Sequence, residues 1–219
     1  MKIETDNYPL AVVGAGTMGR GIAQVAASAG HPVILYDILE KNTQDAMKFI
    51  EQRLEDSFQK GKITKNSKIQ LIKNIKPVNK LDEIFKSKLI LEAVIEDLEI
   101  KQELFCRLES VLEAESILST NTSSLDLNKI GTNLKRPERF VGMHFFNPVH
   151  IMKLVEIVVG ISTSEETISR TRAFSDAISK SSILVCSSLV DTATCWNTRL
   201  PGPIWMHAFS EYMPVPMKL

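Results

Sequence analysis

Residues 12–30, "VVGAGTMGRGIAQVAASAG", set the fold class, because three glycines in G-x-G-x-x-G spacing stand between an apolar run and a helix-forming segment. In this spacing the first glycine allows a tight turn, the second lets a pyrophosphate approach the backbone, and the third lets helix and strand pack closely. The start of the helix then offers free N–H groups to the phosphates. Alone, such glycines also suit a merely tight turn. Here, between strand and helix, they predict a dinucleotide-binding loop formed by Gly14, Gly16, Thr17, Met18 and Gly19.

An acidic residue closes the next apolar run. Asp37 ends "VILYD", eighteen residues after Gly19, where a carboxylate can accept hydrogen bonds from the adenosine ribose hydroxyls. The same charge repels a 2′-phosphate, so we expect NAD rather than NADP. Asp37 would also serve as the N-cap of the following helix, a role that is compatible with ribose binding.

Short apolar runs alternate with amphipathic stretches from Tyr8 to about Val185. This pattern predicts an α/β fold of the doubly wound Rossmann type, with a mostly parallel sheet. The expected strands are "YPLAVVG", "PVILYD", "IKPV", "KLILEAV", "SILSTN", "RFVGMHF", "KLVEIVV" and "SILVC". The expected helices are 17–29, 40–59, 80–86, 98–113 and 164–179. The long second helix and the lysine-rich "QKGKITKNSK" after it are expected to project from the sheet.

The composition excludes several classes of protein. Lys plus Arg and Asp plus Glu number 26 each, so no overall field favours nucleic acid or a membrane surface as a partner. No apolar run is long enough to span a membrane. The three cysteines are odd in number and show no CxxC spacing, which favours a reducing compartment and predicts no metal site. We expect a cytoplasmic protein, or one in the mitochondrial matrix.

The composition changes near residue 186. Both tryptophans, four of the nine prolines and three of the eight methionines lie beyond Val185, and helical or strand periodicity is lost there. Proline removes a backbone donor and clashes with the preceding turn of a helix. We therefore predict an NAD-binding domain over residues 1–186 and an irregular tail over 187–219.

Unusual polar residues lie in "STNTSSLDL", "MHFFNP" and "KLVEIVV", at the ends of expected strands. Ligands of open α/β sheets bind outside the carboxyl ends of the strands, so these segments can converge on a cofactor. Glu156 stands in an apolar strand, which we expect to be buried on both faces, so its carboxylate needs a partner. Pairing with His144 would provide one. The pair would form a general base and its orienting acid, suited beside a nicotinamide to oxidising a secondary alcohol.

Each of these residues also has a structural interpretation. Ser123 and Asp126 would suit the cap of a helix that begins at Leu125, Asn147 before a proline would start a turn, and His144 would be a hydrogen-bonded core histidine. In the catalytic interpretation, Ser123 and Asn147 hydrogen-bond the substrate oxygen or hold the nicotinamide.

Four segments together resemble the 3-hydroxyacyl-CoA dehydrogenase family, and most of all its bacterial 3-hydroxybutyryl-CoA dehydrogenases. They are "VVGAGTMGRGIAQVAASAGHPVILYD", "LEAVIEDLEIKQELF", "STNTSSL" and "GMHFFNPVHIMKLVEIVVG". The resemblance runs from about Pro9 to Val185. It implies NAD-dependent oxidation of the 3-hydroxyl of a short-chain 3-hydroxyacyl-CoA to the 3-oxoacyl-CoA, or the reverse reaction, within fatty acid metabolism.

The resemblance also implies roles for single residues. His144 matches the family's catalytic histidine and Glu156 its partner, while Ser123 and Asn147 match the serine and asparagine of the site. Three more residues match cofactor positions: Asp37, Glu96 and Lys101. Without the family, Glu96 and Lys101 would be interpreted as a solvated helix start. For the polyanionic coenzyme A, the nearest candidates in the helical projection are Lys60 and Lys62, although a charged loop is usually just solvated.

The resemblance ends with the strand "SILVC". Family members continue into a helical domain that closes the active site and forms a homodimer, whereas the segment from Ser187 to Leu219 has a different pattern. We therefore expect that helical domain to be absent. Two alternative functions follow: an NAD-binding fragment of weak or no activity, and a dehydrogenase of free hydroxy acids, against which "HFFNP" and "NTSSL" argue.

Overall fold

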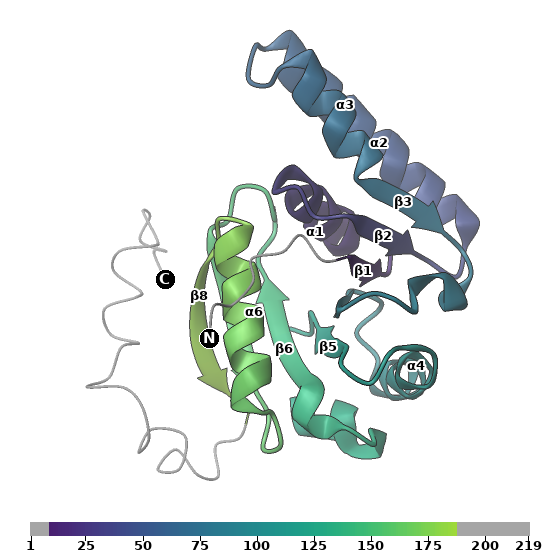
Figure 1. Ribbon diagram of the computed structural model, residues 1–219, viewed down its shortest axis with the longest axis vertical. Coiled ribbons are helices and arrows are strands. Elements are labelled where there is room, and N and C mark those ends of the chain that lie inside the picture. Colours follow the sequence, from purple (N-terminus) through teal and green to yellow (C-terminus); the bar gives the residue numbers. More distant parts are fainter. Residues whose placement is uncertain (1–8, 188–219) are drawn as a thin grey trace, which may run out of the picture. The chain divides into compact units, whose positions relative to one another are not determined.

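The computed structural model describes residues 9–187 (Figure 1). The predicted tail therefore lies outside the described residues from position 188 onward. Within residues 9–187 all eight predicted strands are confirmed, and they form one sheet in the order β3-β2-β1-β4-β5-β6-β7-β8. The strands are β1 (Leu10–Val13), β2 (Val33–Tyr36), β3 (Ile75–Val78), β4 (Leu89–Glu92), β5 (Ile117–Thr120), β6 (Phe140–Phe145), β7 (Leu154–Val159) and β8 (Ser181–Cys186).

Helices and turns fill the connections between these strands. The α-helices are α1 (Thr17–Ser28), α2 (Glu40–Gln59), α3 (Lys65–Lys73), α4 (Leu98–Val111), α5 (Leu127–Ile130) and α6 (Glu165–Ala177). Three short 3-10 turns are η1 (Leu81–Ile84), η2 (Gly131–Asn133) and η3 (Pro137–Arg139). The helix predicted over 80–86 is therefore wrong in type, because the segment makes only the single turn η1. None of the helices in the described part of the chain is both long and apolar enough to cross a membrane.

The sheet is mostly parallel, as predicted. β3, β2, β1, β4, β5 and β6 pair in parallel, and β7 pairs with β8 in parallel. Among the strands that the structure describes, only the pair of β6 and β7 is antiparallel. The direction of the sheet therefore reverses at one place, and the amino-terminal half of β7 lies beside the carboxyl end of β6.

The two faces of the sheet are covered by different helices, which makes the fold doubly wound. Leu10 and Val12 of β1 pack with side chains of α1, α2 and α6. Ala11 and Val13 pack on the opposite face with Phe105 and other side chains of α4. Continuous apolar runs such as β1, whose four residues are all buried, are typical of parallel strands covered on both faces.

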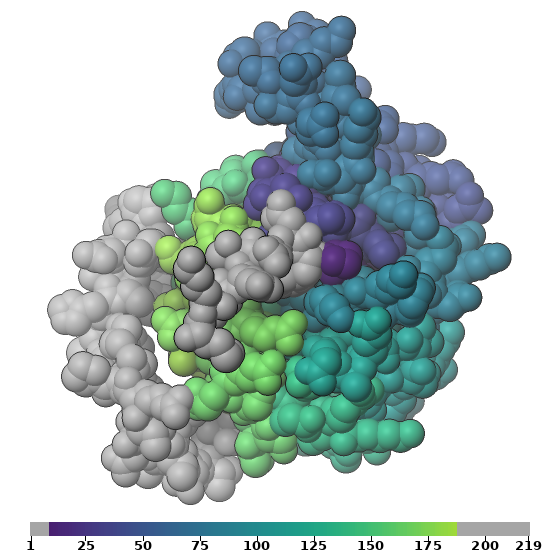
Figure 2. All heavy atoms as spheres, viewed as in Figure 1, coloured from purple at the N-terminus to yellow at the C-terminus, as the bar shows by residue number. Residues whose placement is uncertain are grey.

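The predicted projection is a pair of helices, α2 and α3. Figure 2 shows one end of this pair protruding from the rest of the described domain, while Ala46, Ile50 and Leu54 of α2 belong to the domain's core. Gly61, which follows the C-cap Lys60 of α2, has a φ of +68°, a backbone conformation that glycine adopts without strain. Helix α3 was not predicted. Its signal is local, because Thr64 is the N-cap and its hydroxyl accepts from the Ser67 amide, an arrangement common at helix starts.

Candidate active site

The glycine-rich loop leaves room for a phosphate beside Gly16, whereas Gly14 and Gly19 are packed closely against backbone atoms. A Cβ on Gly14, where φ is +101°, would lie 2.6 Å from the Ala93 carbonyl oxygen, and a Cβ on Gly19 would lie 1.7 Å from that of Gly14. A Cβ on Gly16 would meet nothing within 4 Å. Gly16 is the N-cap of α1 and brings no side chain, so the first N–H groups of α1 remain available. The loop therefore fits the pyrophosphate of a dinucleotide.

Asp37 braces this loop from the end of β2. Its Oδ2 accepts from the Ala15 amide at 2.9 Å, and its Oδ1 accepts from the Leu39 amide and the Asn42 side chain, each at 3.0 Å. Leu39, not Asp37, is the N-cap of α2, so the capping interpretation is wrong. A carboxylate offers about four acceptor positions, which leaves about one for a ribose hydroxyl.

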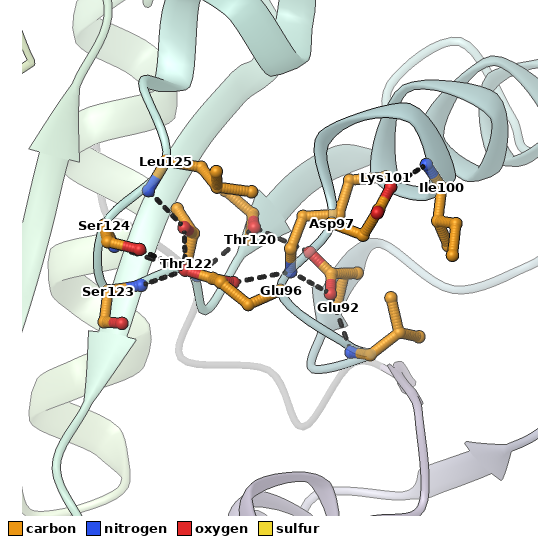
Figure 3. A network of polar contacts seen from close by, with 11 residues as sticks. Glu92, Glu96, Asp97, Ile100, Lys101, Thr120, Thr122, Ser123, Ser124 and Leu125 are labelled. Carbon is orange, nitrogen blue, oxygen red and sulfur yellow. Dashed lines mark hydrogen bonds and ion pairs between the residues drawn. The ribbon is translucent and has the colours of Figure 1, made fainter.

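A buried ion pair supports the next loop of the site (Figure 3). Lys101, on the first turns of α4, is 1% exposed, and Glu92, at the end of β4, is 0% exposed. The Lys101 Nζ donates to Glu92 Oε1 at 2.6 Å and lies 3.4 Å from Glu96 Oε2. Lys101 is therefore not part of a solvated helix start. It holds the turn between β4 and α4 at a fixed distance from the sheet.

Glu96 connects that turn to the segment that carries Ser123. Its Oε1 accepts from the Thr122 hydroxyl at 2.5 Å and from the amides of Ser123 at 2.9 Å and Ser124 at 3.2 Å. Burial alone would raise the pKa of Glu96, but the hydrogen bonds and the nearby charge of Lys101 outweigh it and lower the pKa from 4.5 to about 2. Glu96 is thus an anion that organises the loop after β5.

Sequence reasoning missed three polar residues of this network. Glu92 Oε2 accepts from the Thr120 hydroxyl at 2.6 Å. Asn121 joins β5 to β6, because its Oδ1 accepts from the Phe145 amide at 2.8 Å. Glu92 carried the same signal as Glu156, a single acid in the apolar run "LILEAV".

The structure brings His144 and Glu156 together. They are directly paired in the register of β6 and β7, and His144 Nδ1 lies 2.8 Å from Glu156 Oε2. The His144 ring also contacts Phe146, with centroids 4.6 Å apart. Because Nδ1 is engaged, Nε2 is the ring nitrogen available for a proton.

The prediction that the strand of Glu156 is buried on both faces is wrong. Glu156 is 30% exposed and its strand is not buried on both faces. Val155 and Ile157 face the core beneath α6, so Glu156, which alternates with them, points to the other face. That face of β7 and β8 is only partly covered by the described residues. The carboxylate is therefore accessible to a ligand.

The remaining predicted residues lie at the surface. Ser123 is exposed, and the short helix after it begins at Leu127 with Asp126 as its N-cap, not at Leu125. Asn147 is exposed beside a cis peptide bond to Pro148. Lys60 and Lys62 are exposed at and just beyond the end of α2 that is farthest from Glu40. Within residues 9–187 no group of three or more His, Cys, Asp or Glu side chains is arranged to hold a metal ion.

A basic cluster lies between α1, α2 and the loop after β6. The Arg20 guanidinium stacks 3.7 Å from the Phe49 ring centroid, and Arg53 lies 5.7 Å from the same centroid. Arg20 Nε is buried and has no hydrogen-bond partner among residues 9–187. Burial, followed by the charges of Arg53 and Lys180, lowers the pKa of His150. No carboxylate of the described chain forms an ion pair with Arg20 or Arg53, so the cluster can receive an anion.

Comparison with known proteins identifies the domain type. Residues 9–188 match the family model of the 3-hydroxyacyl-CoA dehydrogenase NAD-binding domain. The chain is 42% identical over 161 residues to a 3-hydroxyadipyl-CoA dehydrogenase of Escherichia coli. It is 37% identical over 179 residues to a 3-hydroxybutyryl-CoA dehydrogenase of Clostridioides difficile. These matches cover 74% and 82% of this chain but 34% and 64% of the relatives, so the chain spans between a third and two thirds of their length.

Solved structures give the same result. A 3-hydroxybutyryl-CoA dehydrogenase from Escherichia coli superposes with a TM-score of 0.81 at 39% identity, covering 83% of this chain and 38% of that one. The (S)-3-hydroxybutyryl-CoA dehydrogenase of Ralstonia eutropha superposes with a TM-score of 0.81 at 32% identity, covering 86% and 68%. The agreement extends over both the fold and the sequence of the described domain.

Proposed function

This chain belongs to the 3-hydroxyacyl-CoA dehydrogenase family, and we propose that it oxidises the 3-hydroxyl of a short-chain 3-hydroxyacyl-CoA to the 3-oxo group, or catalyses the reverse. The contact of 2.8 Å between His144 and Glu156 carries the proposal. Glu156 holds the ring with a proton on Nδ1, so Nε2 can take the proton of the substrate hydroxyl. Glu156 then stabilises the imidazolium. NAD, when bound, supplies the acceptor of the hydride.

The cofactor is expected to lie along the glycine loop, with its pyrophosphate at Gly16 and its ribose at Asp37. Ser123 and Asn147 are proposed to hydrogen-bond the substrate oxygen or the nicotinamide, since both are exposed near the ends of β5 and β6. Glu96 is proposed to line the cofactor site and to fix the segment of Ser123 there, because its carboxylate accepts a hydrogen bond from the Ser123 amide. Lys101 is proposed to support the cofactor site indirectly, by holding Glu96 in place, because its ammonium group is buried against Glu92 and Glu96.

Coenzyme A carries several phosphate charges and needs cationic partners. The cluster of Arg20, Arg53 and His150 supports its binding, because these side chains have no carboxylate partner within residues 9–187 and lie on α1, on α2 and on the loop after β6. Lys60 and Lys62, at and just beyond the end of α2, remain proposed contacts.

The test is turnover of acetoacetyl-CoA with NADH by the full 219-residue chain. His144→Ala should lower kcat by about 10²- to 10⁴-fold, the usual contribution of a general base, with the NAD dissociation constant unchanged. Glu103→Gln, an exposed acid on α4, is the control and should leave kcat unchanged. A His144→Ala variant with normal turnover would refute the catalytic role. NAD binding without any turnover by the wild type would favour the alternative, an NAD-binding protein of weak or no activity.

A further inference from the structure

Lys180 is a buried cation that the proposed reaction does not use. It lies between α6 and β8 and is 8% exposed. Its Nζ donates to the carbonyl oxygen of Val149 at 2.5 Å and to that of Met152 at 2.6 Å. The next residue, Ser181, donates its amide to the Lys153 carbonyl at 2.8 Å. Lys180 and its neighbour thus engage three carbonyls of one loop.

That loop, residues 146–153, joins the strands that carry His144 and Glu156. It contains Asn147 and His150. Inside it, the amides of Ile151 and Met152 both donate to the Pro148 carbonyl. Val149 is 3% exposed, and a Cβ on Gly21 would lie 3.0 Å from it. The loop is therefore held against α1 on one side and by Lys180 on the other.

An isolated buried ammonium group is an expensive way to hold a loop. Burial lowers the pKa of Lys180, and no carboxylate of the described residues forms an ion pair with it. For stability alone, an apolar side chain often serves as well as a buried charge. The ammonium provides something an apolar group cannot, which is strong donors aimed at two carbonyls of the loop.

We propose that Lys180 is a positioning residue that fixes the loop 146–153 and thereby keeps Asn147, three residues after His144, and His150, in the basic cluster, in place between the strands that carry His144 and Glu156. The expected effect of Lys180 on turnover rests on the proposed function, whereas its expected effect on the loop is independent of that function. Misplacement of a site by about 1 Å can lower a rate by about 10²-fold. Loss of the hydrogen bonds that Lys180 donates should therefore lower kcat, although no reacting group is removed.

The test compares hydrogen exchange and kinetics of the full chain in Lys180→Met, Lys180→Arg and the exposed neighbour variant Lys153→Met. In Lys180→Met we expect the Ile151 and Met152 amides to exchange at least about tenfold faster, a loss of at least about 1.4 kcal/mol of local protection. The amides of β1 should be unchanged. We also expect kcat to fall about tenfold or more with the NAD dissociation constant unchanged. Lys180→Arg, which keeps the charge and donors, should restore much of both, and Lys153→Met should resemble the wild type.

Unchanged hydrogen exchange at the Ile151 and Met152 amides would overturn the proposal. Equally faster exchange of the β1 amides would overturn it too, because it would mean that the whole domain is less stable. Faster exchange of the loop with normal kcat would overturn it as well. If Lys180→Met does not fold, Lys180→Gln is measured in its place, and failure of both to fold assigns Lys180 to stability alone. If the wild type has no dehydrogenase activity, the proposed function fails, and the exchange data still decide whether Lys180 anchors the loop.

Discussion

His144 and Glu156 occupy directly opposite positions in the antiparallel pair of β6 and β7, with Nδ1 and Oε2 2.8 Å apart. Opposite residues of such a pair point to the same face of the sheet. The reversal of strand direction at β7 therefore brings an acid from a separate strand to the imidazole at the end of β6. The geometry of the proposed base depends on this register, since a slip by one residue would turn Glu156 to the other face.

Replacing Glu156 by glutamine should impair catalysis while leaving the fold intact. A neutral amide cannot stabilise the imidazolium and can select the wrong tautomer, so kcat should fall by about 10²- to 10⁴-fold. Steady-state kinetics with acetoacetyl-CoA measures the effect, and the melting temperature should shift little because Glu156 is 30% exposed. A variant with wild-type kcat would show that Glu156 only packs beside the ring.

The glycine loop predicts opposite results for two alanine variants. Gly16→Ala should fold normally, since its Cβ meets nothing within 4 Å, but the methyl group should weaken NAD binding by about tenfold or more, about 1.4 kcal/mol. Gly19→Ala should be destabilised by about 1–3 kcal/mol or fail to fold, because its Cβ would lie 1.7 Å from the Gly14 carbonyl oxygen. Calorimetry and thermal melts separate the two effects. Normal NAD affinity in Gly16→Ala would argue against the pyrophosphate site.

The buried pair of Glu92 and Lys101 should be sensitive to the loss of one partner. Glu92→Gln leaves the Lys101 ammonium buried without its main counter-ion, so the free energy of unfolding should fall by about 3–5 kcal/mol. The double variant Glu92→Leu with Lys101→Met should be more stable than Glu92→Gln alone, because no charge is then left buried. Urea denaturation gives the values, and a loss below about 1 kcal/mol in Glu92→Gln would contradict the arrangement.

Glu96 should make stability depend on pH in the acid range. Its pKa is about 2 in the folded protein against 4.5 for the free side chain, so its stabilising contribution is fully present above about pH 4.5. That contribution is lost as the pH falls toward about 2, because protonation then favours the unfolded chain. Urea unfolding of the wild type and Glu96→Gln from about pH 6 to about pH 2 should show a difference that shrinks on acidification. A difference independent of pH would mean that Glu96 is not held as an anion.

The affinity for coenzyme A should depend more on the basic cluster of Arg20, Arg53 and His150 than on the lysines at the end of α2. Arg53→Gln should raise the dissociation constant of free coenzyme A by about tenfold, since a charge-assisted contact to phosphate contributes about 1.5 kcal/mol or more. Lys60→Gln, which changes an exposed side chain, should have a smaller effect. Isothermal titration at two salt concentrations measures both. Equal losses in the two variants would assign the phosphates to the whole length of α2.

The positions of the strands along the chain and of the dinucleotide loop follow from local sequence patterns. Apolar runs, glycine spacing and the acid after "VILY" depend on neighbours along the chain, and so the eight strands and the position of Asp37 could be predicted. Helix α3 was missed although its cap is also local. Its segment is rich in lysine and lacks a clear apolar face, so tertiary contact with α2 supports the helix.

The sequence by itself determined the class of fold, the place of the glycine loop, and the candidates His144 and Glu156. Only the tertiary structure decided their pairing, through the antiparallel register of β6 and β7. It also decided that Lys101 is buried on Glu92, that Glu96 binds the Ser123 segment, and that Lys180 holds the loop after β6. The physical reason is that hydrogen bonds and ion pairs between side chains depend on distances in space, which residues far apart in the chain acquire only when the strands have paired and packed.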